Sequence, residues 1–276
     1  MEFLSLLYGT LLLRPYVFVF LAVYLAIAIL NMGVKRSLIF TVLGYGIAFL
    51  AEYCSTRTGF PFGYYEYLET TRTQELWIAN VPFMDSLSFS FLAYISYGLS
   101  LLLWSPLTRG GWDVRLVDRA AIPGSWRILV TGAVLFMLLD VVIDPIAFLG
   151  DRWFLGQIYT YREAGEYFNI PLTNFAGWFL VGFTILFCFS RVNRWLTRRP
   201  GFVDHGMRDI PGQALLAPAL YFSVLIFNLG VTFYIGEYRL GFCGLALTLS
   251  IFALTLFRAR RSPDAEKKPG STVIAE

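Results

Sequence analysis

The fold is decided by one stretch of sequence, Ile128-Leu-Val-Thr-Gly-Ala-Val-Leu-Phe-Met-Leu-Leu-Asp140-Val-Val-Ile-Asp144-Pro-Ile-Ala-Phe-Leu149. It is apolar over a length that crosses a bilayer as a helix. Asp140 and Asp144 lie inside it, and the stretch holds no Lys or Arg to neutralise them. One charged side chain at the centre of a membrane helix costs about 2.5 to 3.5 kcal/mol, so carboxylates in such a position indicate a functional site.

The spacing of the two acids places both on one face of the helix. Residues four apart in a helix have Cβ atoms about 5 to 6 Å from each other. Desolvation and mutual repulsion then both favour the neutral form of at least one carboxyl. We expect one of them to keep its proton at neutral pH. The alternative is a structural acid pair capped by Ser, Tyr or Asn of neighbouring helices, because polar groups buried in membranes find internal partners.

The rest of the chain has the same character. Of its 276 residues, 57% are hydrophobic and 15% are charged, and the mean hydropathy of +0.61 is typical of a polytopic membrane protein. We predict an all-α transmembrane bundle in a single domain, residues 1–261, with an interfacial segment at 1–13 and a disordered cytoplasmic tail at 262–276. Seven apolar windows predict about seven helices, at 15–31, 37–53, 86–104, 128–149, 171–190, 213–235 and 239–257.

The positions of Lys and Arg predict the orientation. Most of them fall at 35–36, 109–127, 191–208 and 258–268, which all lie on one side of the membrane. The positive-inside rule then predicts N-out, C-in, with Glu52, Asp85, Asp144 and Asn174 near the outer leaflet. The net charge of +3 follows from these loops. No compact basic surface interleaved with aromatic residues indicates nucleic acid as a partner.

Several cofactor chemistries lack their residues. The single histidine, His205, lies in a predicted cytoplasmic loop, so histidine-ligated di-iron and haem sites have no ligands. All three lysines lie outside the windows, which excludes a retinal Schiff base. Cys54, Cys188 and Cys243 are scattered and indicate neither a disulfide framework nor a zinc site. We predict a site without metal or cofactor.

A loop rich in turn residues follows Glu52. Its sequence is Glu52-Tyr-Cys-Ser-Thr-Arg-Thr-Gly-Phe-Pro-Phe-Gly-Tyr-Tyr-Glu-Tyr67, and Gly59, Pro61 and Gly63 predict tight turns that bring its aromatic rings back to the bilayer surface. We interpret it as a re-entrant or capping loop, or else as part of an interfacial aromatic belt. Glu52 is a candidate site residue, although a structural ion pair with Arg57 or Arg72 would also explain it.

Two further segments lie at the same predicted level. In Tyr167-Phe-Asn-Ile-Pro-Leu-Thr-Asn174-Phe-Ala-Gly-Trp178, Asn174 and Trp178 lie one turn apart on one helix face. Trp178 is therefore a candidate site residue, or a lipid-facing anchor. Asn80-Val-Pro-Phe-Met-Asp85 leads into the third window, where the position of Asp85 is more typical of a helix N-cap than of a catalyst.

In this order, the segments resemble the integral-membrane carotenoid hydratase family, of the γ-carotene C-1′ hydratase and bisanhydrobacterioruberin hydratase type. The resemblance covers most of the chain. Its pieces are Glu52 with Thr58-Gly-Phe-Pro-Phe-Gly63 and Tyr65, then Val81-Pro82, then Asp140 with Asp144-Pro145, then Tyr167 to Trp178, with Asn174-Phe-Ala-Gly-Trp178 as the closest match.

The resemblance implies an enzyme that adds water to the terminal 1,2 double bond of an acyclic carotenoid ψ-end, as a hydro-lyase without redox cofactor. It implies a carotenoid substrate, surrounding membrane lipid, other carotenoid biosynthesis enzymes as partners, and a place in a prokaryotic cytoplasmic membrane. A desolvated carboxyl suits the protonation of an alkene. We assign Asp144 as the acid with Asp140 as its partner, Glu52 and Asn174 as the residues that hold water, and Phe62, Tyr64, Tyr65, Phe175 and Trp178 as substrate-binding residues.

Other functions share these features. A carotenoid cyclase of the lycopene type would use the same protonation and capture the cation with an internal double bond. A membrane prenyltransferase would need a second aspartate-rich motif, which is absent from the sequence. A proton-coupled transporter or a carotenoid-binding scaffold would also use buried acids, although we find no inverted repeat.

Overall fold

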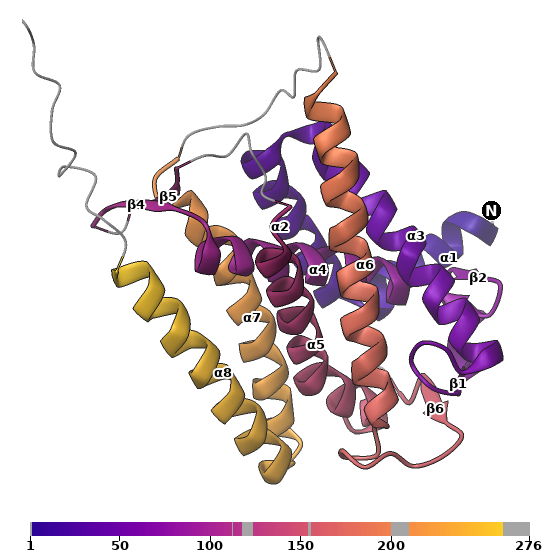
Figure 1. Ribbon diagram of the computed structural model, residues 1–276. Coiled ribbons are helices and arrows are strands. Elements are labelled where there is room, and N and C mark those ends of the chain that lie inside the picture. The colour runs from indigo at the N-terminus through magenta and orange to yellow at the C-terminus, as the bar shows by residue number, and fades with distance from the viewer. Residues whose placement is uncertain (1, 112, 118–123, 154–155, 200–209, 262–276) are drawn as a thin grey trace, which may run out of the picture.

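The computed structural model describes residues 2–111, 113–117, 124–153, 156–199 and 210–261. His205 and the predicted tail at 262–276 lie outside the described residues. Seven helices in the described part are long and apolar enough to cross a membrane, so the predicted all-α bundle is confirmed. Figure 1 shows them after a shorter helix, α1 (Glu2–Leu13): α2 (Pro15–Met32), α3 (Val34–Thr58), α4 (Phe83–Trp104), α5 (Trp126–Phe148), α6 (Leu172–Thr197), α7 (Gln213–Tyr234) and α8 (Tyr238–Arg260).

Helix α4 is the centre of the bundle. Of its apolar window 72% is buried inside the protein, the highest share of the seven, and it contacts α2, α3, α5, α7 and α8. Small residues let its neighbours approach closely, as in membrane helix packing generally. A Cβ on Gly44 of α3 would lie 3.1 Å from Ser90 Oγ, and a Cβ on Gly98 of α4 would lie 2.3 Å from Ala217 Cβ of α7.

Three short antiparallel ribbons lie outside the helices. Strand β1 (Tyr65–Tyr67) pairs with β6 (Tyr159–Tyr161), β2 (Trp77–Ile78) with β3 (Val81–Pro82), and β4 (Leu107–Gly110) with β5 (Asp113–Leu116). Figure 1 shows β1 and β6 at one end of the bundle and β4 and β5 at the other. The β1–β6 pair joins loops nearly a hundred positions apart in the sequence, and it forms one wall of the site described below.

The loop after α3 turns back over the end of the bundle. Gly59 closes α3 in the left-handed conformation, with φ of 78°, which glycine adopts without steric cost. Gly177 lies beneath this turn, because a Cβ there would be 2.7 Å from the carbonyl oxygen of Pro61. Phe62 and Tyr65 are buried while Phe60 and Tyr64 remain exposed. The capping loop is therefore confirmed.

The site carboxyls and the main basic segments lie at opposite ends of the helices. Arg109 of β4 donates to the carbonyl of Arg260, and Arg36 donates to Asn193, so the basic segments meet at the end that carries β4 and β5. Asp144 and Glu52 lie near the other ends of α5 and α3. The N-out, C-in orientation relative to a bilayer stays a prediction.

Candidate active site

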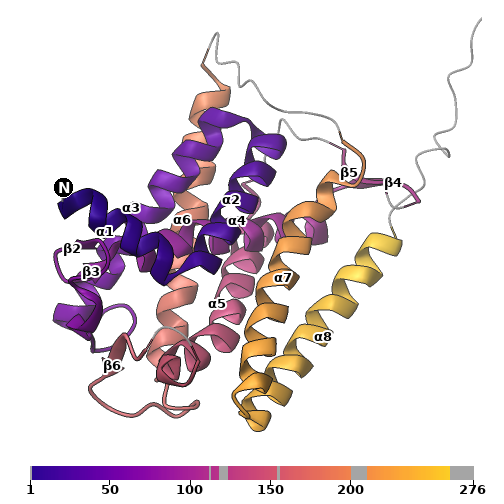
Figure 2. The same cartoon turned by 180° about the vertical axis from the view of Figure 1, so that it is seen from behind.

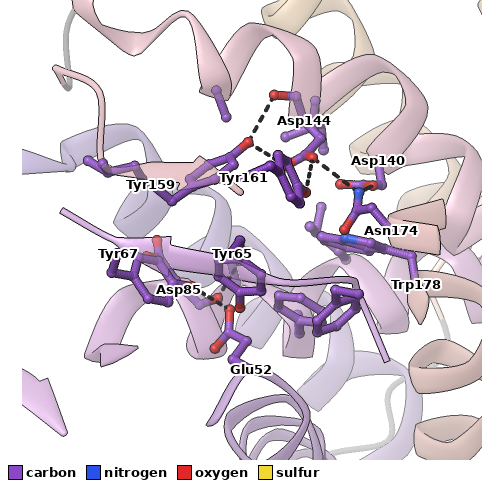
Figure 3. Close-up of a pocket in the computed structure, with 17 residues that line it drawn as sticks. Glu52, Tyr65, Tyr67, Asp85, Asp140, Asp144, Tyr159, Tyr161, Asn174 and Trp178 are labelled. Atoms are coloured by element: carbon purple, nitrogen blue, oxygen red, sulfur yellow. Dashed lines mark hydrogen bonds between the residues drawn. The ribbon is translucent and has the colours of Figure 1, made fainter. Parts of the chain in front are cut away.

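Asp140 and Asp144 line one cavity of about 130 Å³, called the reaction cavity below. Asp140 is fully buried and Asp144 is half-buried. The cavity lies where α3 and α5 end and α4 and α6 begin, beneath the β1–β6 ribbon (Figure 3). Its lining residues are Glu52, Phe62, Tyr65, Tyr67, Asp85, Ser88, Phe89, Leu92, Asp140, Ile143, Asp144, Ala147, Ile158, Tyr159, Tyr161, Asn174 and Trp178.

Asn174 of α6 bridges the two aspartates. Its Nδ2 donates to Asp140 Oδ2 at 2.7 Å and to Asp144 Oδ2 at 3.1 Å. An amide nitrogen carries two hydrogens, so both are used here. Asn174 therefore fixes the acids relative to each other through its Nδ2, and the role in holding water that was expected for it stays a prediction.

The β1–β6 ribbon brings four tyrosines to the cavity. Alternate residues of a strand face the same side, so the Tyr-X-Tyr pattern in both strands directs all four rings together. Tyr159 donates its hydroxyl to Asp144 Oδ1 at 2.7 Å, and Tyr161 donates to Asp144 Oδ2 at 3.0 Å. Burial raises the pKa of the phenol groups of Tyr65, Tyr67, Tyr159 and Tyr161 well above 10, so they remain donors at physiological pH.

The hydrogen bonds of the two aspartates are unequal. Asp144 accepts from Tyr159, Tyr161 and Asn174, whereas Asp140 accepts from Asn174 alone. The second carboxyl oxygen of Asp140, Oδ1, is buried without a hydrogen-bond partner among the described residues. The alternative of a fully capped structural pair therefore describes Asp144 but not Asp140.

A second set of acids lies across the cavity, as Figure 3 shows. Glu52 is buried, accepts from the hydroxyl of Tyr67 at 2.9 Å, and also accepts from Ser86. The alternative of an ion pair between Glu52 and Arg57 or Arg72 is wrong, because Arg57 donates to Asn80 and Arg72 pairs with Glu69. Both arginines are exposed, Arg57 in the last turn of α3 and Arg72 in the loop beyond it, and their hydrogen-bond partners do not include the buried carboxyl.

Asp85 lies on the same side of the cavity as Glu52 and pairs with a buried arginine, Arg14. Arg14, between α1 and α2, forms ion pairs with Asp85 and with Glu75, the latter at 2.9 Å. Asp85 makes no N-terminal capping bond, since α4 already begins at Phe83 after Pro82. The expectation of a helix cap is therefore wrong. Burial raises the pKa of Glu75 although Arg14 opposes this shift.

Aromatic rings form the apolar floor of the cavity. Trp178 stacks on Phe89, with ring centroids 4.3 Å apart, and lies 4.7 Å from Phe136. Phe62 completes the group at 6.3 Å from Trp178. Trp178 is only 8% exposed, so the alternative of a lipid-facing anchor is wrong. One turn of α6 thus brings Asn174 to the acids and Trp178 to the floor.

Most of the site residues predicted from the sequence line the reaction cavity, but Tyr64 and Phe175 do not. Tyr64 is 45% exposed, with Arg162 over its ring, and Phe175 packs against Tyr167; neither lines the cavity. Tyr159 and Tyr161 were missed, although their Tyr-X-Tyr repeat of the pattern at Tyr65 was a visible signal. Arg14 had no such signal, because its partners lie more than sixty positions away.

No group of three or more His, Cys, Asp or Glu side chains in the described part of the chain has the arrangement of a metal site. The carboxyls of Glu52, Asp140 and Asp144 accept hydrogen bonds from neutral donors, namely tyrosine and serine hydroxyls and the amide of Asn174. Asp85 is the exception, because it pairs with Arg14. The site thus has proton donors and hydrogen-bond acceptors on two opposite sides of an apolar cavity.

Residues 13–251 match the model of a family described as "Carotenoid biosynthesis protein", a range that includes every residue of the reaction cavity. Over 173 residues, 62% of the chain, the sequence is 32% identical to bisanhydrobacterioruberin hydratase of Haloarcula japonica. The match covers 47% of that protein, so the chain spans about half the length of this curated relative. No solved structure matches the chain.

Proposed function

Because the chain belongs to the carotenoid biosynthesis protein family, we propose that it is a hydro-lyase that adds water across the terminal 1,2 double bond of an acyclic carotenoid ψ-end. The product is a tertiary alcohol, and no redox cofactor takes part. One observation carries the proposal: a buried carboxyl, Asp140, has an unpartnered oxygen beside an aromatic cavity. The name of the Haloarcula relative, a hydratase, supports the same reaction class. The proposed location is a prokaryotic cytoplasmic membrane.

The hydrogen-bond inventory favours Asp140 as the proton donor, with Asp144 ionised, the reverse of the assignment made from sequence. A hydrogen bond to a charged group contributes about 1.5 to 3 kcal/mol. Three such bonds to Asp144 sum to about 4.5 to 9 kcal/mol, which exceeds the insertion cost of about 2.5 to 3.5 kcal/mol for a charge. The single bond to Asp140 contributes about 1.5 to 3 kcal/mol, which is comparable with or below that cost, so Asp140 is the carboxyl of the pair that keeps its proton.

The volume of the reaction cavity limits which part of a long carotenoid can enter it. A cavity of roughly 150 Å³ holds one benzene ring. A space of about 130 Å³ therefore takes one end group of about five or six carbons, and the rest of the polyene must lie elsewhere. This fits a reaction at the tip of a long chain rather than in its middle.

Protonation and capture then occur from opposite sides. Asp140 transfers its proton to C2 of the double bond, which leaves a tertiary cation at C1. The carboxylate of Asp144 and the ring face of Trp178 stabilise this cation. Water on the far wall attacks C1, and Glu52 accepts the proton that the water loses. Glu52 then releases its proton to solvent water and Asp140 takes one up from it, so both carboxyls return to their starting states and the net reaction consumes one water.

Expression in a host that accumulates lycopene tests the proposal. We expect a product heavier by one water per reacted end, in air and under anoxia alike, with its oxygen labelled when the cells grow in heavy-oxygen water. A product of unchanged mass but altered spectrum would identify a cyclase instead. Bound pigment with neither mass nor spectrum changed would leave a binding or transport protein and refute hydration.

A further inference from the structure

A second cavity, also of about 130 Å³, adjoins the reaction cavity. Six residues line both, which places the boundary between α4 and α5. Two of the six, Ser88 on α4 and Ala147 on α5, have small side chains. The shared residues are Asp85, Ser88, Leu92, Ile143, Ala147 and Ile158.

Flat aromatic rings dominate the second cavity. The ring of Phe227 stacks on that of Tyr16, with centroids 5.2 Å apart, and lies 5.8 Å from Phe20 and 6.4 Å from Trp153. Phe91 lies 6.2 Å from Phe20. Such rings pack well against other flat π systems in offset or edge-on geometry.

The polar side chains at this cavity make hydrogen bonds or ion pairs within the protein, although Arg14 Nε and Asp85 Oδ2 have no hydrogen-bond partner among the described residues. Arg14 pairs with Asp85, Ser88 donates to the carbonyl of Asp85, and Asn228 donates to the carbonyl of Val224 at 2.8 Å. An apolar ligand therefore leaves these hydrogen bonds intact.

The second cavity lies toward the outside of the bundle. Its outer wall is formed by α2 and α7, which pack side by side (Figure 2). Tyr16, Phe20 and Phe227 of these helices are only half-buried, so the wall is one side chain thick. A chain that runs from the reaction cavity through the second cavity therefore comes within one layer of side chains of the outer surface of α2 and α7.

We infer that the second cavity binds the first part of the conjugated polyene chain that follows the ψ-end. This inference rests on the proposed function. The terminal double bond of a ψ-end is separated by two saturated carbons from the conjugated chain, which is flat and rigid. With the end group in the reaction cavity, the polyene occupies the adjoining aromatic space and extends between α2 and α7 into lipid.

The test compares two variants on α7, purified in lipid nanodiscs with lycopene as the probe. Val224→Phe fills the second cavity, because Val224 is buried in its lining and does not line the reaction cavity. Ile226→Phe is the matched control, because Ile226 is 64% exposed on the same helix. We expect Val224→Phe to raise KM and the dissociation constant for lycopene by about tenfold or more with little change in kcat, since close-packed space admits no extra ring. Ile226→Phe should match the wild type.

The outcomes separate this inference from the proposed function. Hydration that proceeds in Val224→Phe with unchanged KM and unchanged binding refutes the polyene site alone. A lower kcat at constant KM also refutes it, because filling the second cavity would then leave substrate binding unchanged. Lycopene that binds in a Val224-dependent way but is never hydrated refutes the proposed function and keeps the site. If Val224→Phe does not fold, Phe227→Leu serves, since loss of its ring should weaken binding about two- to tenfold.

Discussion

Replacing Asp140 with asparagine is the sharpest test of the proposed chemistry. The amide has nearly the shape of the carboxyl, and its oxygen can still accept the 2.7 Å bond from Asn174. Fold and substrate binding should therefore persist. The variant cannot donate the proton, and general acid catalysis contributes about 10² to 10⁴ in rate. This loss corresponds to about 2.7 to 5.4 kcal/mol in the barrier.

The assay measures lycopene hydration by product mass, together with lycopene binding and the thermal unfolding midpoint. We expect kcat to fall about 10²- to 10⁴-fold while binding and unfolding stay near wild type. Asp151→Asn is the control, because Asp151 is exposed and lies outside the cavity. A folded Asp140→Asn variant with kcat within threefold of wild type would show that Asp140 is not the donor. If Asp144→Asn alone loses activity, the roles of the two acids are those first assigned from the sequence.

Three further outcomes follow from the geometry. The four tyrosines of β1 and β6 have pKa values raised by burial, whereas in the unfolded chain tyrosine ionises near pH 10. Their contribution to stability is complete below about pH 10 and is lost as the pH rises above it, so the thermal unfolding midpoint should drop above about pH 10. The drop should be smaller in a variant with all four tyrosines changed to Phe. Arg14→Leu should lower the free energy of unfolding by about 3 to 5 kcal/mol, because it leaves the buried Glu75 and the partly buried Asp85 without their cation. Adding Glu75→Gln should restore part of this loss, as chemical denaturation would measure. Gly177→Ala should reduce the hydration rate, because its Cβ would push the capping loop outward. Gly230→Ala has open space around its Cβ and should leave the rate unchanged. Equal rates in the two variants would contradict the packing argument.

The helices were predictable because hydropathy is a local property. Each apolar window became a helix, and the spacing of Asp140 and Asp144 placed both on one face that lines the cavity. The windows were less accurate at their ends. The third window began at 86, but α4 begins at Phe83, which puts Asp85 in the first turn and not at the cap.

The partners of the acids were not predictable by the same means. Tyr159 and Tyr161 lie in a polar loop, and they reach Asp144 only because β6 pairs with β1. Arg14 follows an apolar helix, and nothing nearby in sequence indicates that it forms ion pairs with Asp85 and Glu75. Tyr64 and Tyr65 are adjacent in sequence, but strand geometry directs only Tyr65 into the cavity.

The sequence by itself determined that this chain is a membrane bundle with two acids on one helix face, because bilayer insertion depends on contiguous apolar length and helix periodicity depends on neighbouring residues. Only the tertiary structure decided that Asp144 has three hydrogen-bond donors and Asp140 one, and that a second carboxyl wall lies across the cavity from them. Those contacts join residues from separate helices and from the β1–β6 ribbon, and their formation depends on how whole elements pack together.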